Sequence, residues 1–527
     1  MNNLVPATDM AALETLDYFT NYEVLKDPYA WFEAIRAHGP VYQPPGRDYF
    51  IVTGFSEMLE VLGNTEDFSA IIGLQGAAAP LPFTPEGADI TAQVEAHRSE
   101  ILGGDFLVNL DDMSHTKLRS LVNALFTPSR LKANEQYLSA LADRMVRDVV
   151  AKGGCDLIKE ICTPFVTLVI ADLLGVPAAD RQHFMNLIES SPVPGSLNSD
   201  ENDFSAEDHP MVAMAGYFVQ YIQDRRDNPR DDILTEFANA TYPDGTRPDL
   251  QTLVNLAIFL FGAGQDTSAK LLGNAMRFIT DQPGLQAQLR ENPALIPAML
   301  EEVLRLEGST KQTARLARKD TKIGETKVPA GTKVLLALAA ANRDPRRWDD
   351  PNAFTLDRPR IKEHLGFGRG RHVCAGAPLA RVEVRVILEK FLAHTADIAL
   401  AEEVHGPRGT RQLDYEPSFI IRGLSALQVR FTPSQDFVPN EAQVQEAAPV
   451  KTAAAAYSVD ETKLGVLLDT PAARAVLDKH FPGISTDARI GMAKGMTLRA
   501  VAAFSPDQFP RAALEAVNAE LAQLPVA

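Results

Sequence analysis

The chain has 527 residues, 45% of them hydrophobic, which is enough apolar material for a large buried core in one or more domains. Its 69 acidic and 51 basic residues give a formal net charge of -18, which argues against nonspecific binding to nucleic acid or anionic lipid, because both need a positive field. Three cysteines with no CxxC pair argue against a disulfide framework and favour a reducing compartment, so we predict a cytoplasmic protein.

The N-terminal segment does not resemble an export signal. Met1–Phe19 carries Asp9, Glu14 and Asp17 and lacks a basic start followed by an apolar core. From residue 15 to about 433, long amphipathic helical segments alternate with short strand-like runs. The clearest of these runs are Tyr49–Thr53, Lys333–Leu338 and Phe419–Arg430. The pattern predicts an α+β domain that is mostly α-helical.

Two stretches between helices look irregular, Gly73–Gly104 and Ser190–Pro210, and loops of this length are often functional lids. Between them lie Cys155 and Cys162. Their spacing of seven residues would place both on one helical face, and we expect them to be buried apolar thiols.

Leu253–Met276 is predicted to be a helix. Its most apolar part, Leu253–Ala263, is shorter than the roughly 20 residues that a membrane span needs. The helix contains Ala263-Gly264-Gln265-Asp266-Thr267, in which Gly264 weakens the helix and the Thr267 hydroxyl can bond the Ala263 carbonyl, opening a small groove. An ordinary core helix, with its Asp paired to a base, is the alternative interpretation.

Further along, Glu302 and Arg305 stand at i and i+3 of a predicted helix. Such a pair alone is usually a surface salt bridge of small value.

A glycine-rich turn then delivers Cys374 to a helix N-terminus. The segment Phe367-Gly368-Arg369-Gly370-Arg371-His372-Val373-Cys374-Ala375-Gly376 leads into helical spacing over Ala377–Phe391. Exposed N–H groups and the helix dipole favour a thiolate there, and the glycines allow close approach of a flat cofactor. A buried apolar thiol is the alternative.

This segment resembles the haem-binding signature of the cytochrome P-450 family, Phe-Gly-x-Gly-x-His-x-Cys-x-Gly, and every specified position is matched. The resemblance implies a soluble bacterial monooxygenase with the P-450 fold, a large helical domain with small β-sheets, over about residues 15–433. It also implies haem b (iron protoporphyrin IX), with Cys374 as the axial ligand of the iron and Phe367, Gly368, His372 and Gly376 beside the cofactor.

The resemblance assigns roles to the earlier motifs. Asp266 and Thr267 become the catalytic acid and hydroxyl that relay protons to bound oxygen, with Ala263 and Gly264 flanking the haem. Glu302 and Arg305 become a buried structural pair, tied to Arg358 of the later segment Phe354-Thr355-Leu356-Asp357-Arg358.

Haem propionates need cationic partners. The resemblance nominates His115, Arg119, Arg315 and His372, each of which could alternatively be a surface charge.

The electrons should come from another protein, because the chain has neither a glycine-rich dinucleotide fingerprint nor a cysteine set for an iron–sulfur cluster. We predict a ferredoxin (2Fe-2S or similar), reduced from NAD(P)H by a ferredoxin reductase. Near Cys374 a basic cluster, opposed only by Glu383, would steer it; its members are Arg369, Arg371, Arg381 and Arg385. A solvated positive face, or arginines bound to propionates, is the alternative.

The predicted reaction is hydroxylation of a small hydrophobic substrate, whose identity no motif specifies. We expect its pocket to be lined by Gly73–Gly104, the Ser190–Pro210 region, Phe261 and Ala263, Ser309–Thr313 and Ser418–Ile420. Two other hypotheses are a peroxide-driven peroxygenase, which the Asp266-Thr267 pair disfavours, and a noncatalytic haem-binding sensor.

The resemblance stops near Pro433. We therefore predict a monooxygenase domain over 1–433, a linker over 434–457 and a small helical module of unknown role over 458–527. Helix starts are predicted at Thr470–Pro471 and Ser505–Pro506, and the last helix carries Leu514, Val517, Leu521 and Leu524 on one stripe.

Overall fold

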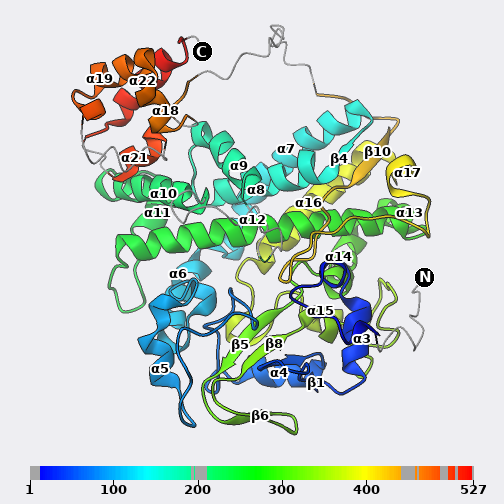
Figure 1. The fold of residues 1–527 in the computed structure, drawn as a ribbon. Coiled ribbons are helices and arrows are strands. Elements are labelled where there is room, and N and C mark those ends of the chain that lie inside the picture. Colours follow the sequence, from blue (N-terminus) through cyan, green and yellow to red (C-terminus); the bar gives the residue numbers. More distant parts are fainter. Residues whose placement is uncertain are drawn as a thin grey trace.

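The computed structural model describes residues 12–191, 195, 210–440, 457–459, 462–486, 497–504 and 508–524. One helix, α12 (Leu250–Asp281), crosses the middle of the molecule, with most other long helices on one side of it and the main sheet on the other (Figure 1). Asp249 caps its start, because the Asp249 side chain accepts a hydrogen bond of 2.6 Å from the N–H of Thr252. None of the helices in the described part of the chain is both long and apolar enough to span a membrane.

The other long helices surround α12. They are α6 (Asp112–Leu125), α7 (Pro128–Lys152), α8 (Thr163–Leu173), α9 (Arg181–Glu189), α10 (Pro210–Asp227), α14 (Ile296–Glu307) and α16 (Ala377–His394). Shorter helices connect them: α2 (Tyr22–Lys26), α3 (Tyr29–Arg36), α4 (Phe55–Gly63), α5 (Thr91–Ala96), α11 (Ile233–Ala238), α13 (Leu285–Glu291), α15 (Leu338–Ala341) and α17 (Glu402–His405).

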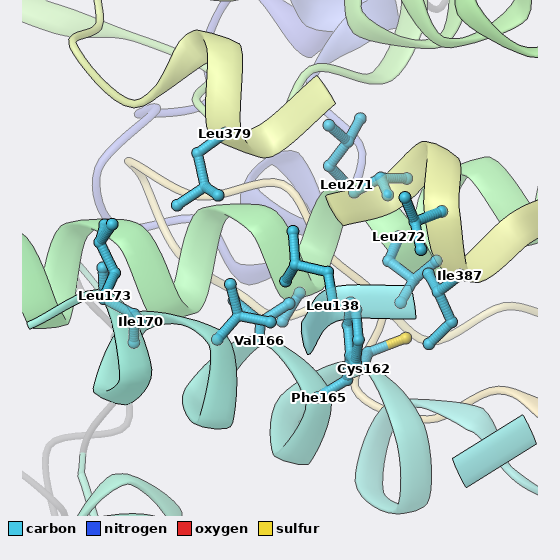
Figure 2. Packing of buried hydrophobic residues seen from close by; sticks show 14 of the residues in the cluster. Leu138, Cys162, Phe165, Val166, Ile170, Leu173, Leu271, Leu272, Leu379 and Ile387 are labelled. Atoms are coloured by element: carbon cyan, nitrogen blue, oxygen red, sulfur yellow. The ribbon is translucent and has the colours of Figure 1, made fainter. Parts of the chain in front are cut away.

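The largest apolar core lies where α7, α8, α12 and α16 meet (Figure 2). Val166 and Ile170 of α8 lie between α8 and α12, where a Cβ on Gly264 of α12 would come within 3.2 Å of Ile170 Cδ1. Each such side chain contributes about 2 kcal/mol when it is fully buried, so this contact fixes α12 firmly over α8.

Three small sheets complete the domain. The main sheet has the order β1-β2-β8-β5-β3, in which β2 and β8 are parallel and the other pairs antiparallel. Its strands are β1 (Val41–Tyr42), β2 (Tyr49–Val52), β3 (Phe68–Ser69), β5 (Thr313–Ala317) and β8 (Lys333–Leu336). The antiparallel sheet β4-β10-β9 comprises β4 (Gly154–Asp156), β9 (Thr395–Leu400) and β10 (Gln428–Pro433), and β6 (Thr321–Ile323) pairs with β7 (Thr326–Val328).

The end of the chain forms a separate apolar cluster between residues 457 and 521. Its helices are α18 (Leu464–Asp469), α19 (Pro471–His480), α21 (Leu498–Phe504) and α22 (Arg511–Leu521). The predicted stripe is present, since Leu514, Val517 and Leu521 are buried and Leu524 packs against them. In Figure 1 this group of helices lies beside α10, and α21 contacts α10.

The mostly helical α+β architecture agrees with the expected fold class, but several local predictions were wrong. Cys155 and Cys162 are buried as expected, yet they do not share a helix, because Cys155 lies in β4, paired with Val429 of β10. Gly73–Gly104 contains the helix α5. The strand predicted from Phe419 begins only at Gln428. The last helix begins at Arg511, and the predicted start at Ser505 and Pro506 lies outside the described residues. Most of residues 190–210 and most of the predicted linker also lie outside them.

Candidate active site

Cys374 stands two residues before Gly376, the N-cap of α16, in a loop that glycine makes possible. Gly370 has φ of +74°, and a Cβ there would lie 2.5 Å from the carbonyl oxygen of Leu62. The N–H of Cys374 donates to the Phe367 carbonyl at 2.9 Å, which closes the loop. Only glycine fits this conformation and this approach to α4.

Burial raises the pKa of the Cys374 thiol, whereas the N–H groups of Gly376 and Ala377 and the Arg119 guanidinium act to lower it. A metal cation at the sulfur would complete the stabilisation of the thiolate. Cys155 differs, because burial and the charges of Glu160 and Asp156 raise its pKa to about 12, and only the charge of Lys152 acts to lower it. Of these two sulfurs, only that of Cys374 has surroundings suited to a ligand.

A cavity of about 310 Å³ opens in front of Cys374. The cysteine loop forms one wall, and α12 contributes the facing wall. Predicted site residues that line the cavity are His115, Arg119, Ala263, Gly264, Thr267, Arg315, Phe367, Gly368, His372, Cys374 and Gly376. Residues from four separate segments of the sequence thus meet around one space.

One side of this cavity is a basic cluster formed by His115, Arg119, Arg315 and His372, of which His115 and Arg315 are buried. The His115 and His372 rings lie 4.3 Å apart between centroids, and both ring nitrogens of His115 are buried without a hydrogen-bond partner among the described residues. Arg315 is 5% exposed and donates to the Ala314 carbonyl at 2.7 Å and the Thr313 hydroxyl at 3.3 Å. In the described part of the chain no member of the cluster forms a salt bridge.

Burial, together with the neighbouring positive charges, lowers the pKa of His115 to about 4 and that of His372 to about 2. Burial lowers the pKa of Arg315 to about 10. Buried cationic groups without a carboxylate partner are costly unless a ligand brings negative charge. The cluster therefore fits the two propionates of a haem, and the flat, glycine-lined space beside Cys374 fits its ring.

The structure separates the two neighbours Asp266 and Thr267. The Thr267 hydroxyl donates to the Ala263 carbonyl at 2.8 Å, as predicted, and Ser309 donates to the Thr267 carbonyl at 2.7 Å. Thr267 lines the cavity, but Asp266 does not. The Asp266 carboxylate lies instead 3.8 Å from the ammonium group of Lys270.

Glu302, Arg305 and Arg358 meet in a buried ionic triad. Glu302 and Arg305 are fully buried and share two hydrogen bonds of 2.8 Å, and Arg358 donates to Glu302 at 2.9 Å. Arg305 also donates to the carbonyls of Pro351 and Ala353 at 2.6 and 3.0 Å. The triad fixes the 351–358 segment to α14, away from the cavity.

The predicted basic surface is partly neutralised. Arg381 donates to Glu301 at 2.6 and 2.9 Å, and Arg385 pairs with Glu389 at 2.8 Å and with Glu135. Arg369 and Arg371 instead donate to the backbone carbonyls of Lys362 and Asp112. Within the described residues these last two have no carboxylate partner, so they carry the net positive charge of this face.

Glu383 was interpreted from the sequence as an acid opposing the arginines, and this was wrong. It is 2% exposed and lines the cavity. Burial raises its pKa to about 8, with the Ser268 hydroxyl acting against this shift. The sequence did hold a signal, because Glu383 falls between Leu379 and Val386 on the apolar face of α16.

The apolar part of the cavity also differs from the expected lining. Ala263, Ser309, Thr310 and Thr313 contribute as predicted, but Phe261 packs against Phe184 instead. Residues 73–104 and 418–420 are absent from the lining found within the described residues. Side chains that were not predicted supply most of the wall: Leu107, Val108, Phe126, Val166, Ile170, Phe259, Leu260, Leu271 and Leu338.

Comparison with known proteins gives a consistent result. The family model for cytochrome P450 matches residues 85–395. The chain is 30% identical over 433 residues to cytochrome P450 144 of Mycobacterium tuberculosis, covering 80% of this chain and 94% of that protein. It is 29% identical over 414 residues to the vitamin D(3) 25-hydroxylase of Pseudonocardia autotrophica, covering 77% of this chain and 94% of that one.

Among solved structures, substrate-free cytochrome P450 CYP150A6 of Mycobacterium marinum superimposes with a TM-score of 0.74 at 44% identity, covering 80% of this chain and all of that one. CYP109E1 of Bacillus megaterium in complex with corticosterone gives a TM-score of 0.65 at 25% identity, covering 77% of this chain and 99% of that one. Members of this family bind haem b through a cysteine thiolate and act as monooxygenases. The chain belongs to the cytochrome P450 family.

Proposed function

We propose that this enzyme hydroxylates a small, neutral, hydrophobic molecule, with Cys374 as the thiolate that would bind its haem iron and a ferredoxin as its electron donor. The observation that carries the proposal is the arrangement of Cys374, Thr267 and the unpaired basic cluster around one cavity. Haem b, when bound, supplies the oxygen-activating chemistry.

Each group of residues would have a separate task. His115, Arg119, Arg315 and His372 would hold the propionates, and the loop from Phe367 to Gly376 would hold the ring and the iron. Thr267 would present its hydroxyl to the distal side, as the last group of a proton path that continues through Asp266. The apolar side chains of α8 and α12 would exclude bulk water and orient the substrate.

The substrate class follows from the wall of the cavity. Phe259, Leu260, Val166, Ile170 and Leu338 are apolar, and the charged residues of the lining, Arg119, Arg315, Arg369 and Glu383, come from other segments. A charged substrate would lose its hydration there without gaining a partner. The vitamin D(3) and corticosterone named for two relatives are likewise largely apolar.

The ferredoxin proposal is supported by Arg369 and Arg371, whose positive charges border the loop that carries Cys374. An acidic ferredoxin would be steered toward such a surface.

We further propose a cytoplasmic location, for which the three free cysteines are the support. We also propose a separate C-terminal module over 458–527, joined to the rest by a linker over 434–457.

The spectrum of the reduced, carbon-monoxide-bound protein tests the ligand. We expect a strongly red-shifted Soret band, because thiolate ligation produces it, and we expect Cys374→Ser to lose this band. Cys155→Ser is the matched control, since that thiol lies in β4 and should leave the band unchanged. A normal haem-carbonyl band in the unaltered protein would refute the assignment.

Turnover with hydrogen peroxide alone, equal to ferredoxin-driven turnover, would contradict the proposed electron donor.

A further inference from the structure

Lys270 is a buried cation placed between two carboxylates. It is 6% exposed and stands one turn after Asp266 on α12. Its ammonium group contacts Glu416 closely, whereas Asp266 lies 3.8 Å away. The second oxygens of both acids, Asp266 Oδ2 and Glu416 Oε2, are buried and have no hydrogen-bond partner among the residues that the structure describes.

The segment around residues 415–424 is shaped to hold this lysine. Tyr415 and Leu424 form an antiparallel bridge, and the N–H of Glu416 donates to the Gly423 carbonyl at 3.0 Å. A Cβ on Gly423 would lie 2.2 Å from Cδ of Lys270, so the lysine stem passes directly over that glycine. One hairpin thus supplies both the space for the stem and the partner for the charge.

The positive and negative charges of the trio formed by Lys270, Asp266 and Glu416 are unequal. With both acids ionised, one cation and two anions would leave a net negative charge in a buried site, which is costly. One proton makes the trio neutral. Because Lys270 is held by Glu416, the proton is better placed on Asp266, which is the acid farther from the cation.

We propose that Lys270 and Glu416 are positioning residues for the reaction: Glu416 engages Lys270, and this engagement keeps Asp266 protonated beside Thr267. This inference rests on the proposed function, in which Thr267 passes protons to the haem side of the cavity. Glu416 competes with Asp266 for Lys270, and this competition leaves Asp266 able to donate. Burial raises the pKa of both acids, in agreement with a shared proton.

The other charged and titratable groups near the trio come from two further elements. Cys162 approaches Lys270 from the 158–162 segment, and burial raises the pKa of this thiol well above its usual value, so it stays neutral. Asp414 lies near Glu416 on the hairpin but is 65% exposed and paired with Lys26. Neither group can take the place of Lys270.

Two substitutions should move the protonation of Asp266 in opposite directions. In Glu416→Gln, Lys270 is free to pair with Asp266, and the trio is neutral with Asp266 ionised. In Lys270→Met, no cation remains, so both acids should hold protons. We therefore expect the pH midpoint of Asp266 ionisation to fall by about 1 unit or more in the first variant and to rise in the second.

Infrared spectroscopy of the ferric protein measures the pH midpoint of Asp266 ionisation without turnover. The protonated carboxyl band that disappears in Asp266→Asn identifies the group, and its pH titration gives the midpoint. Glu403→Gln, which removes an exposed carboxylate paired with Arg430, is the matched control and should leave the band unchanged. An unaltered midpoint in Glu416→Gln would overturn the proposal, and this variant keeps the test valid if Lys270→Met fails to fold.

Activity gives the second measurement. With a bound substrate, Glu416→Gln should form less product per electron consumed, and the loss should shrink at lower pH, where Asp266 regains its proton. A merely structural role would lower product formation equally at every pH. The infrared result does not depend on thiolate ligation or on the electron donor, so failure of this inference and failure of the proposed function can be distinguished.

Discussion

At the scale of single residues, the site is defined by polar groups that the protein leaves without internal partners. His115 and Asp266 each carry buried atoms with no hydrogen bond among the described residues, and Arg315 is a buried cation outside any salt bridge found there. Such groups destabilise the fold unless they serve a ligand or a reaction. These three residues lie around the cavity or on the helix beside it.

Glu383 predicts a specific dependence of stability on pH. Its pKa is raised to about 8 in the folded protein, from an ordinary value of 4.5, because it is buried. Between these pH values the folded state keeps a proton that the unfolded state releases, so the free energy of unfolding falls as pH rises through this window. The loss amounts to at most about 5 kcal/mol and is complete above pH 8.

Glu383→Gln cannot ionise and should remove this pH dependence. We expect urea-induced unfolding of the variant to match the unaltered protein near pH 4.5 and to require more urea at pH 8. Glu402→Gln, at a side chain that is 67% exposed, should show no such pH-dependent difference. Equal urea midpoints for Glu383→Gln and the unaltered protein at pH 8 would show that Glu383 is not held protonated.

At the scale of elements, the sequence predicted what local patterns determine and missed what distant segments decide. The helix before Thr267 and the turn that presents Cys374 were predictable, because glycine, threonine and helical spacing act within a few residues. Asp266 and Thr267 point in different directions because successive side chains on a helix are rotated by about 100°. The pairing of Lys270, near Asp266, with Glu416 could not be predicted, since Glu416 is 146 residues from Lys270.

The same reason explains the errors. The spacing of Cys155 and Cys162 suggested one helix, but β10, more than 270 residues later, recruits Cys155 into a strand. Arg381 appeared free from its neighbours in sequence, while its partner Glu301 is 80 residues earlier. Long-range pairing leaves no periodic signal in a single sequence.

The cysteine loop as an element gives a further prediction. Gly370→Ala should weaken haem retention strongly, because the new Cβ would meet the Leu62 carbonyl at 2.5 Å in a residue with φ of +74°. Gly153→Ala is a matched control, since Gly153 has φ of +80° but nothing within 4 Å of the added Cβ. The measurement is the rate of haem loss to an excess of an apo-globin acceptor. Equal rates in the two variants would mean that the contact of Gly370 with the Leu62 carbonyl does not govern haem retention.

At the scale of the whole molecule, the chain joins a complete P450 fold to an additional group of helices. Cytochrome P450 144 and CYP150A6 are covered over 94% and 100% of their length by 80% of this chain. The apolar cluster between 457 and 521 shares no residue with the large core cluster. Among the described elements, α21 contacts α10, the helix that packs on α12 (Figure 1).

Deletion of residues 441–527 tests whether this addition acts on the active site through α10. The carbon-monoxide spectrum should be unchanged, because every residue proposed to hold the haem lies before residue 377. Backbone amides of α10 should exchange their hydrogens faster, since the deletion uncovers the face that α21 contacts, while those of α14 should exchange as before. Faster exchange would show that the C-terminal helices cover α10, the helix that packs on α12, in solution. Unchanged exchange in α10 would mean that the two parts behave independently in solution.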